Sequence, residues 1–139
     1  VNGLFYCCKS VLSHMKKQKD GLIINVSSWA GKEVSLLSGV TYTSSKHAVN
    51  AMTETINMKY CNVGIRACAL CPGEVATPIL DKRPKKLTIE QKNKMLQPDD
   101  LGETIAFLCQ MPNHVCINQL TISPTWHRRY ISDLGIEDL

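Results

Sequence analysis

The sequence predicts an α/β fold in which helices cover both faces of a doubly wound parallel sheet. Two short apolar runs, residues 22–26 and 65–71, have the pattern of strands covered on both faces. Each run follows a longer segment with helical periodicity, and the connections between them are short. Helix, strand, helix, strand with tight connections is the pattern of a parallel sheet with right-handed crossovers.

Length and composition agree with one domain that has a hydrophobic core. The chain has 139 residues, of which 44% are hydrophobic and 20% are charged, and no apolar run approaches the ~18 residues of a membrane span. The net charge of +4 is small and dispersed. We therefore expect neither a nucleic acid partner nor a membrane partner.

The first helix is predicted over residues 3–16, where apolar residues recur at intervals of three and four. These residues are Leu4, Phe5, Cys8, Val11, Leu12 and Met15. Lysines follow at the end of the segment, and cations there are favoured because they complement the negative end of the helix dipole. Asp20-Gly21 then ends the helix. The first strand follows at residues 22–26.

The second helix is predicted over residues 42–60, after a loop at residues 35–39. Its apolar positions are Ala48, Val49, Met52, Ile56 and Met58. The second strand, residues 65–71, ends at Pro72-Gly73, because proline and glycine both interrupt strand pairing.

The C-terminal part of the chain is predicted to be less regular. Residues 74–83 have no clear period, and a charged helix is predicted over residues 88–96. A further helix runs from Pro98, at the favoured first-turn position, to Met111, with Leu101, Ile105, Phe107 and Leu108 on its apolar side. The last strand is predicted over residues 117–122, and the tail from Pro124 has no clear period.

Seven cysteines lie scattered through apolar segments, which favours buried structural thiols. Cys68 and Cys71 form a single CxxC along a predicted strand, with no second pair to complete a metal site, so we expect no metal. Reduced cysteines without an export signal favour a cytoplasmic location. The basic run at residues 82–86 lacks interleaved aromatic residues and is predicted to be a solvated loop.

A tyrosine and a lysine, Tyr42 and Lys46, open the second helix four residues apart. Residues at this spacing share one helix face, so the ammonium can lie near the phenol. A free phenol titrates near pH ~10, and a nearby cation favours its ionised form, which suits general acid/base chemistry. Ser28 and residues 72–77 follow the two strands, and ligands of parallel sheets bind beyond such carboxyl ends.

Together these motifs resemble the C-terminal half of a classical short-chain dehydrogenase/reductase. The resemblance rests on Val1-Asn2 in the first helix, Ile-Asn-Val-Ser-Ser at residues 24–28 with Ala30-Gly31 after it, Tyr-x-x-x-Lys, and Pro-Gly-x-Val-x-Thr-Pro at residues 72–78. It covers nearly the whole chain in the family's order. It implies a partial Rossmann-like sheet, with residues 1–139 as a partial NAD(P)-binding catalytic domain.

The resemblance implies a catalytic role for four residues. Tyr42 would be the general acid/base, and Lys46 its electrostatic partner. Ser28 would orient the substrate, with Ser27 as the less favoured candidate for that role. Asn2 would hold a water and the lysine in a proton relay.

The same resemblance implies an NAD(P) cofactor, with NADP slightly preferred over NAD. Tyr42 and Lys46 would contribute to its binding, with Lys46 donating to the nicotinamide ribose. Thr77 would bind the carboxamide with help from the backbone near Val75, and Pro72 and Gly73 would shape the turn over the nicotinamide. The implied reaction is hydride transfer between the cofactor and a carbonyl or alcohol.

The family's glycine-rich loop, Thr-Gly-x-x-x-Gly-x-Gly, does not occur in these 139 residues. We therefore expect an incomplete chain, part of a longer protein and inactive alone. Two alternatives stay open. One is a non-catalytic truncated relative acting as an oligomerisation or binding module, and the other is an epimerase or dehydratase of the extended group.

Expected partners of the complete protein are a small-molecule carbonyl or alcohol and further copies of itself. In the family, the helices that correspond to residues 3–16 and 42–60 commonly pack against a second subunit. The resemblance therefore implies a homodimer or homotetramer. The apolar residues between Thr77 and Leu96 suggest a substrate lining, although helix packing explains them equally well.

Overall fold

The computed structural model describes residues 1–34, 38–82 and 86–133. Parts of the loop predicted at 35–39 and of the basic run predicted at 82–86 lie outside the described residues, as does the end of the tail. The helices and strands in chain order are α1 (Asn2–Gln18), β1 (Gly21–Val26), α2 (Val40–Tyr60), β2 (Ile65–Pro72), α3 (Ile89–Asn93), α4 (Pro98–Gln110), β3 (Gln119–Ile122) and α5 (Arg128–Asp133). Short 3-10 turns are η1 (Trp29–Gly31), η2 (Cys61–Val63) and η3 (Pro78–Lys82).

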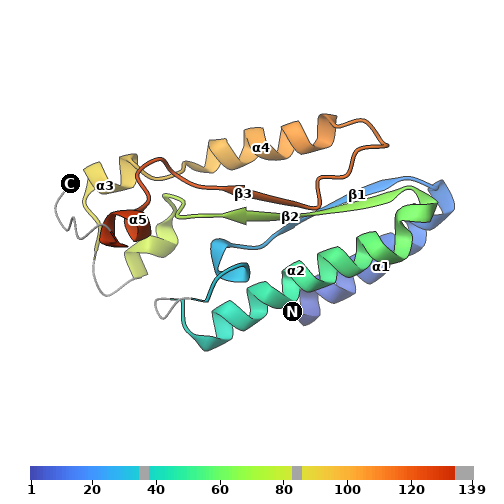
Figure 1. The fold of residues 1–139 in the computed structure, drawn as a ribbon, viewed down its shortest axis with the longest axis horizontal. Helices are drawn as coiled ribbons and strands as arrows, with labels where there is room; N and C mark the ends of the chain where they lie inside the picture. Colours follow the sequence, from blue (N-terminus) through green and yellow to red (C-terminus); the bar gives the residue numbers. More distant parts are fainter. Residues whose placement is uncertain (35–37, 83–85, 134–139) are drawn as a thin grey trace.

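The sheet is parallel, with the order β1-β2-β3. Figure 1 shows α1 and α2 on one face and α4 on the other, which confirms the predicted α/β fold with a doubly wound sheet. The central strand β2 is buried along its whole length, because neighbours cover both its edges and both its faces. The bounds of α1, β1, α2, β2 and α4 differ from the predicted ones by at most two residues.

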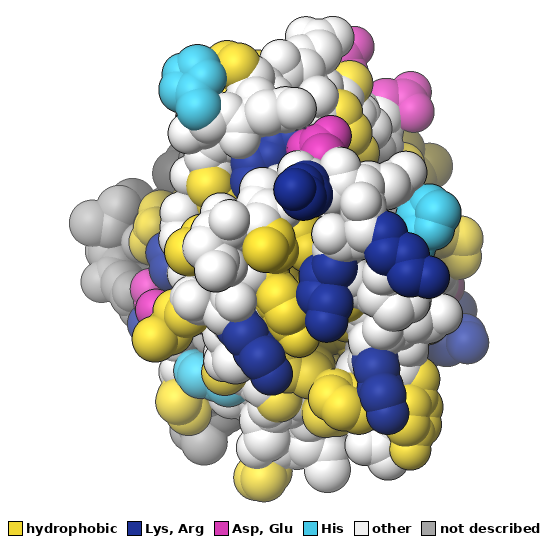
Figure 2. Space-filling model, turned by 90° about the vertical axis from the view of Figure 1, so that its right-hand side faces the viewer, with side chains coloured by type: hydrophobic (Ala, Val, Ile, Leu, Met, Phe, Trp, Pro, Cys, Tyr) yellow, Lys and Arg dark blue, Asp and Glu magenta, His cyan; other side chains and the backbone are white. Residues whose placement is uncertain are grey.

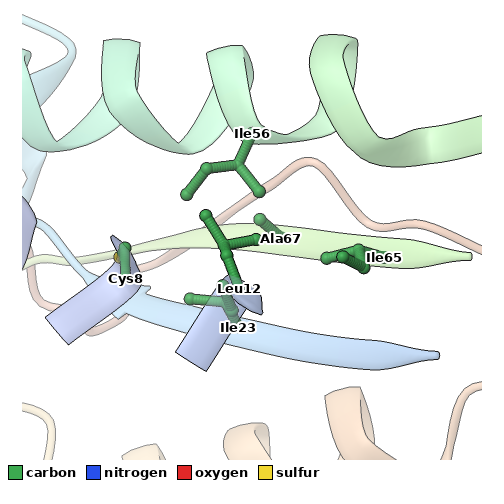
Figure 3. Close-up of a cluster of buried hydrophobic side chains, with 6 residues drawn as sticks. All are labelled: Cys8, Leu12, Ile23, Ile56, Ile65 and Ala67. Atoms are coloured by element: carbon green, nitrogen blue, oxygen red, sulfur yellow. The ribbon is translucent and has the colours of Figure 1, made fainter. Parts of the chain in front are cut away.

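The main hydrophobic cluster joins the first two helices to the first two strands (Figure 3). Cys8 and Leu12 come from α1, and Ile56 comes from α2. Ile23, Ile65 and Ala67 complete the cluster from β1 and β2. Burying a leucine or isoleucine side chain contributes about 1.5–3 kcal/mol, so Leu12 and Ile56 hold α1 and α2 to the sheet.

Four apolar residues predicted to lie on buried helix faces are exposed instead, namely Phe5, Val11, Met58 and Phe107. The reason is the geometry of the helix. Met58 follows the buried Ile56 by two residues, a rotation of about 200° that turns it away from the core. Phe107 precedes the buried Leu108 by one residue, and Phe5 and Val11 flank the stripe formed by Cys8 and Leu12.

The prediction that the cysteines are buried was correct for only three of them. Cys8, Cys68 and Cys71 are buried, whereas Cys7, Cys61, Cys109 and Cys116 are exposed. Burial raises the pKa of the Cys68 thiol to about 11, and the neighbouring thiols add to the effect. Because the thiolate is the reactive form, the Cys68 thiol is unreactive in the folded protein at neutral pH.

The described residues contain no cluster of three or more His, Cys, Asp or Glu side chains placed to hold a metal ion. In the same part of the chain, no helix has the length and apolar character needed to cross a membrane.

The regions after β2 differ from their predicted structure. α3 is shorter than predicted because, after its capping box at Thr88 and Gln91, the chain extends so that Leu96 forms a bridge with Val75. β3 begins at Gln119 rather than at residue 117, and the tail forms α5, which the sequence did not predict. Residues 74–83, predicted to be irregular, contain η3.

β2 is longer than its neighbour β3, so part of β2 has no strand beside it on that side. Asn57 of α2 binds the backbone groups of β2 that are left unpaired there. β3 pairs with β2 only from Ala69 onward. Ahead of that point, the Ala67 N–H donates to Asn57 Oδ1 at 2.6 Å, and Asn57 Nδ2 donates to the Ala67 carbonyl at 2.7 Å. The amide side chain therefore satisfies the backbone groups that a longer strand would have paired.

Candidate active site

The residues predicted to carry chemistry lie at the carboxyl ends of β1 and β2. The two strands are parallel and are paired from Gly21 with Ile65 to Val26 with Leu70. Their carboxyl ends therefore lie side by side at one end of the sheet, which we call its carboxyl edge. Ser27 and Ser28 follow β1, and Tyr42 lies in the first turn of α2. The arrangement matches the position at which parallel sheets bind ligands.

Lys46 links the tyrosine helix to the end of β1. Its Nζ donates a 3.0 Å hydrogen bond to the carbonyl of Val26, the last residue of β1. The same Nζ lies 5.7 Å from the centroid of the Tyr42 ring. The strand therefore holds the ammonium beside the tyrosine, on the helix face that the spacing predicts.

Tyr42 faces outward, with 46% of its surface exposed, while Lys46 is half-buried. A ligand approaching the carboxyl edge of the sheet can therefore reach the phenol without displacing core residues. The ammonium is shielded more from water, which strengthens its electrostatic effect on neighbouring groups.

The two serines make different contacts. Ser27 is buried, and its hydroxyl donates to the carbonyl of Lys46 at 3.1 Å, so it braces the helix. Ser28 is less buried, and its Oγ accepts a 3.2 Å hydrogen bond from the Ala30 N–H as the cap of η1. In the described part of the chain the Ser28 hydroxyl donates to no protein group, so its proton is available to a ligand. Its role as the substrate-orienting residue stays a prediction.

Sequence reasoning missed Asn50 as a support of the site. Its Nδ2 donates to the Gly31 carbonyl at 2.8 Å, which ties η1 to α2 one helical turn beyond Lys46. The four-residue spacing from Lys46 was the available signal, because it places both side chains on the same face of the helix.

Gly31 lies where a larger residue does not fit. A Cβ at this position would lie 2.5 Å from Ser27 Oγ, 2.8 Å from the Lys46 carbonyl oxygen and 3.0 Å from Asn50 Nδ2. The backbone oxygen cannot rotate away, so η1 and the start of α2 would have to separate.

We expect Gly31→Ala to lower the free energy of unfolding by about 1–3 kcal/mol, the usual cost of overpacking. Denaturant titration followed by tryptophan fluorescence measures the loss. Gly102→Ala is the matched control, because nothing lies within 4 Å of its added Cβ and alanine favours the helix interior. Equal stability of Gly31→Ala and wild type would contradict this account of the packing.

The loop after β2 is held by backbone hydrogen bonds on two sides. The Gly73 N–H donates to the Ile122 carbonyl at 2.8 Å, and the Ala76 N–H donates to the Leu96 carbonyl at 2.7 Å. Pro72 is the buried last residue of β2, and Val75 and Thr77 are half-buried. The loop thus presents the Thr77 side chain from a fixed backbone.

Asn2 is the first residue of α1 and is exposed. Within the described ranges, no hydrogen bond joins it to Tyr42, Lys46 or Ser28. Its proposed place in a proton relay stays a prediction.

Among the apolar residues suggested as a substrate lining, Leu80, Met95 and Leu96 are buried, whereas Ile79 and Ile89 are exposed. The three buried residues pack the connection between η3 and α4, so helix packing accounts for them. Leu87 is half-buried, so Ile79, Leu87 and Ile89 have surface with which to contact a ligand.

The surface has two hollows, and Met95 and Leu96 contribute to the lining of the second. One, of about 450 Å³, is lined by residues at the amino end of β2, including Gly64, Ile65 and Arg66. The other, of about 680 Å³, lies beside the start of α4 and is lined by residues that include Asp99 and Trp126. Neither of these two hollows is lined by Ser28, Tyr42 or Lys46.

The opposite end of the molecule, where the strands begin, is rich in Lys and Arg side chains (Figure 2). Both long helices end there with basic residues in their last turns, Lys16 and Lys17 in α1 and Lys59 in α2. Cations at this position complement the negative ends of the helix dipoles, which gives them a structural role.

Comparisons with known proteins agree on one family. A family model described as short chain dehydrogenase matches residues 1–88. An uncharacterized oxidoreductase of Staphylococcus saprophyticus is 33% identical over 124 residues, which are 89% of this chain and 50% of the relative. The chain spans about half the length of the curated relatives that it matches.

Solved structures give the same result. A beta-ketoacyl-[ACP] reductase from Bacteroides thetaiotaomicron superposes with a TM-score of 0.75 at 32% identity, covering 94% of this chain and 52% of that one. A serine dehydrogenase complexed with NADP+ superposes with a TM-score of 0.75 at 26% identity, covering 88% and 51% of the two chains.

Proposed function

The chain belongs to the short-chain dehydrogenase family, and on that premise we propose that it carries the catalytic half of an NAD(P)-dependent oxidoreductase. The proposed reaction interconverts a carbonyl and an alcohol, with Tyr42 as general acid/base. The observation that carries the proposal is the position of Lys46, whose Nζ lies 3.0 Å from the Val26 carbonyl and 5.7 Å from the centre of the Tyr42 ring.

For reduction, the substrate carbonyl oxygen lies between Ser28 and Tyr42 and accepts a hydrogen bond from each hydroxyl. Negative charge develops on that oxygen, and Tyr42 transfers its proton to it. Lys46 stabilises the phenolate that remains, because its ammonium lies beside the ring. In this proposal Asn2 helps to return a proton to Tyr42 from solvent.

The residues present fit the nicotinamide end of NAD(P). Lys46 uses one of its three N–H donors on Val26, which leaves donors for a ribose hydroxyl. Thr77 and the backbone near Val75 lie on the loop after β2, with Pro72 and Gly73 forming its turn. When bound, the nicotinamide supplies the redox chemistry by hydride transfer, and the protein supplies position and protonation.

We propose NADP as the first nucleotide to try, since a structural neighbour was solved with NADP+. The glycine-rich sequence that would hold the pyrophosphate does not occur in these 139 residues. We therefore propose that activity requires a longer gene product than this chain. We further propose a small-molecule substrate, a homodimer or homotetramer and a cytoplasmic location.

The test is a screen of the full-length gene product with NADPH or NADH and a panel of carbonyl compounds. We expect one alcohol to form for each nucleotide oxidised. Product formed without net nucleotide consumption would indicate epimerase or dehydratase chemistry instead. Absence of nucleotide binding by calorimetry would favour a non-catalytic module.

A further inference from the structure

The chain beyond β3 returns across the carboxyl edge of the sheet and contacts both loops of the candidate site. Figure 1 shows α5 at the end toward which β2 points. The first contact is made by Pro124, which packs so close to Gly73 that a Cβ added there would lie 3.2 Å from Pro124 Cδ. We call residues 124–130 the C-terminal segment.

The second contact is a cluster of three aromatic rings beside Ser28. The ring of His127 lies 4.3 Å from that of Trp29, the residue after Ser28, and 4.4 Å from that of Tyr130. Trp29 and Tyr130 complete the cluster edge to face at 5.5 Å. Aromatic pairs at such distances attract one another beyond the effect of their burial, so η1 is bound to the C-terminal segment.

His127 is only 8% exposed, and burial lowers the pKa of its imidazole. Arg129 lowers this pKa further, whereas Glu74 and Glu33 oppose the shift. The ring is therefore held in its neutral form at neutral pH, which suits packing against the indole of Trp29.

The third contact is a pair of ion pairs, one to each loop. Arg128 binds Glu74 through both Nε, at 2.6 Å, and Nη2, and Glu74 lies between Gly73 and Val75 in the loop after β2. Arg129 binds Glu33, two residues beyond η1. Adjacent arginines thus connect the loop that follows β1 to the loop that follows β2.

These ion pairs are partly exposed, so their contribution to global stability is small. The side chains of Arg129 and Glu33 are 46% and 45% exposed, and solvent screens the attraction of such a pair. Breaking one is therefore expected to leave the protein folded. Its main effect is on the relative position of the two loops.

We propose that the C-terminal segment positions the two halves of the candidate site, holding the Ser28 turn in register with the loop at residues 73–77. His127, Arg128 and Arg129 are positioning residues, because they act through Trp29, Glu74 and Glu33. This inference rests on the proposed function, in which Ser28 orients the substrate and the loop after β2 binds the nicotinamide. Loss of these contacts would displace the Ser28 turn relative to the loop after β2. Small displacements of reacting groups lower the reaction rate by large factors.

A charge exchange between Glu33 and Arg129 in the full-length gene product tests the proposal. The single variants Glu33→Arg and Arg129→Glu should each lower kcat/KM for the carbonyl substrate about tenfold. Hydrogen exchange at the amides of Gly31 and Lys32 should rise by a similar factor. The double variant should restore both kcat/KM and the exchange rate to within about twofold of wild type. Glu103→Arg on α4 is the control for Glu33→Arg, because it makes the same change of charge at another exposed position.

The two measurements separate this inference from the proposed function. Unchanged exchange in the single variants, or no recovery in the double variant, would overturn the positioning role. So would single variants that keep wild-type kcat/KM in an enzyme that Tyr42→Phe inactivates. If wild type turns over no carbonyl compound, the proposed function fails, and hydrogen exchange still decides whether the segment holds the loops.

Discussion

Tyr42→Phe is expected to lower kcat of the full-length gene product by about 10²- to 10⁴-fold, the usual contribution of a general acid/base. The substitution removes only the hydroxyl that transfers the proton. The ring remains beside Lys46 Nζ, 5.7 Å away in wild type, so the local structure should persist. Nucleotide binding should change little, because Lys46 and the loop after β2 are untouched.

Steady-state kinetics with the substrate identified by the screen measures the rate, and calorimetry measures nucleotide binding. Tyr60→Phe is the matched control, because Tyr60 is the last residue of the same helix and lies at the other end of it from Tyr42. A Tyr42→Phe enzyme that retains wild-type kcat would remove Tyr42 from the mechanism. Equal losses in both variants would show that the effect concerns the helix and not the proposed proton donor.

Asn57→Ala is expected to lower the free energy of unfolding by about 2–4 kcal/mol. The substitution removes the 2.6 Å bond of the Ala67 N–H and the 2.7 Å bond of the Ala67 carbonyl. The N–H then has no partner in the described part of the chain, and the carbonyl keeps only the weak donor of the Cys116 thiol at 3.8 Å. Asn57 is 8% exposed and Ala67 is fully buried. Asn57 also lines the hollow at the amino end of β2, so water that enters there recovers part of the lost bonding and keeps the expected loss below that of two wholly unpaired groups.

Equilibrium unfolding in denaturant measures this loss. Asn62→Ala is the control, because Asn62 is exposed and such substitutions usually change stability by less than about 0.5 kcal/mol. Asn57→Asp adds a second comparison. It keeps an acceptor for the Ala67 N–H but directs a carboxylate oxygen at the Ala67 carbonyl, so it should also be destabilising. Stability of Asn57→Ala within about 0.5 kcal/mol of wild type would contradict the account.

The first 72 residues could be predicted well because their patterns are local. Periods of three and four residues marked α1 and α2, and short apolar runs marked β1 and β2. The proximity of Tyr42 and Lys46 followed from their spacing on one helix, and the meeting of the strand ends followed from parallel pairing. The roles proposed for Asn2, Ser28, Tyr42, Lys46 and Thr77 stay predictions.

The parts that could not be predicted depend on residues distant in the sequence. The tail has no apolar period, and its His127 is buried by Trp29, which lies 98 positions earlier. Helix periodicity shows that Ile56 and Met58 cannot face the same side, and that Phe107 and Leu108 differ in direction. Which residue of each pair is buried depends on where α2 and α4 meet the sheet.

The sequence by itself determined the α/β architecture, the family and the face of α2 that carries the tyrosine and the lysine. These follow from backbone periodicity and from motifs within a few residues of one another. Only the tertiary structure decided that Val26 holds the lysine, that Asn57 binds the part of β2 that β3 does not pair, and that the C-terminal segment joins the two loops. Such contacts need groups with matching hydrogen-bonding capacity to meet after the chain has folded, and no local pattern specifies which groups will meet.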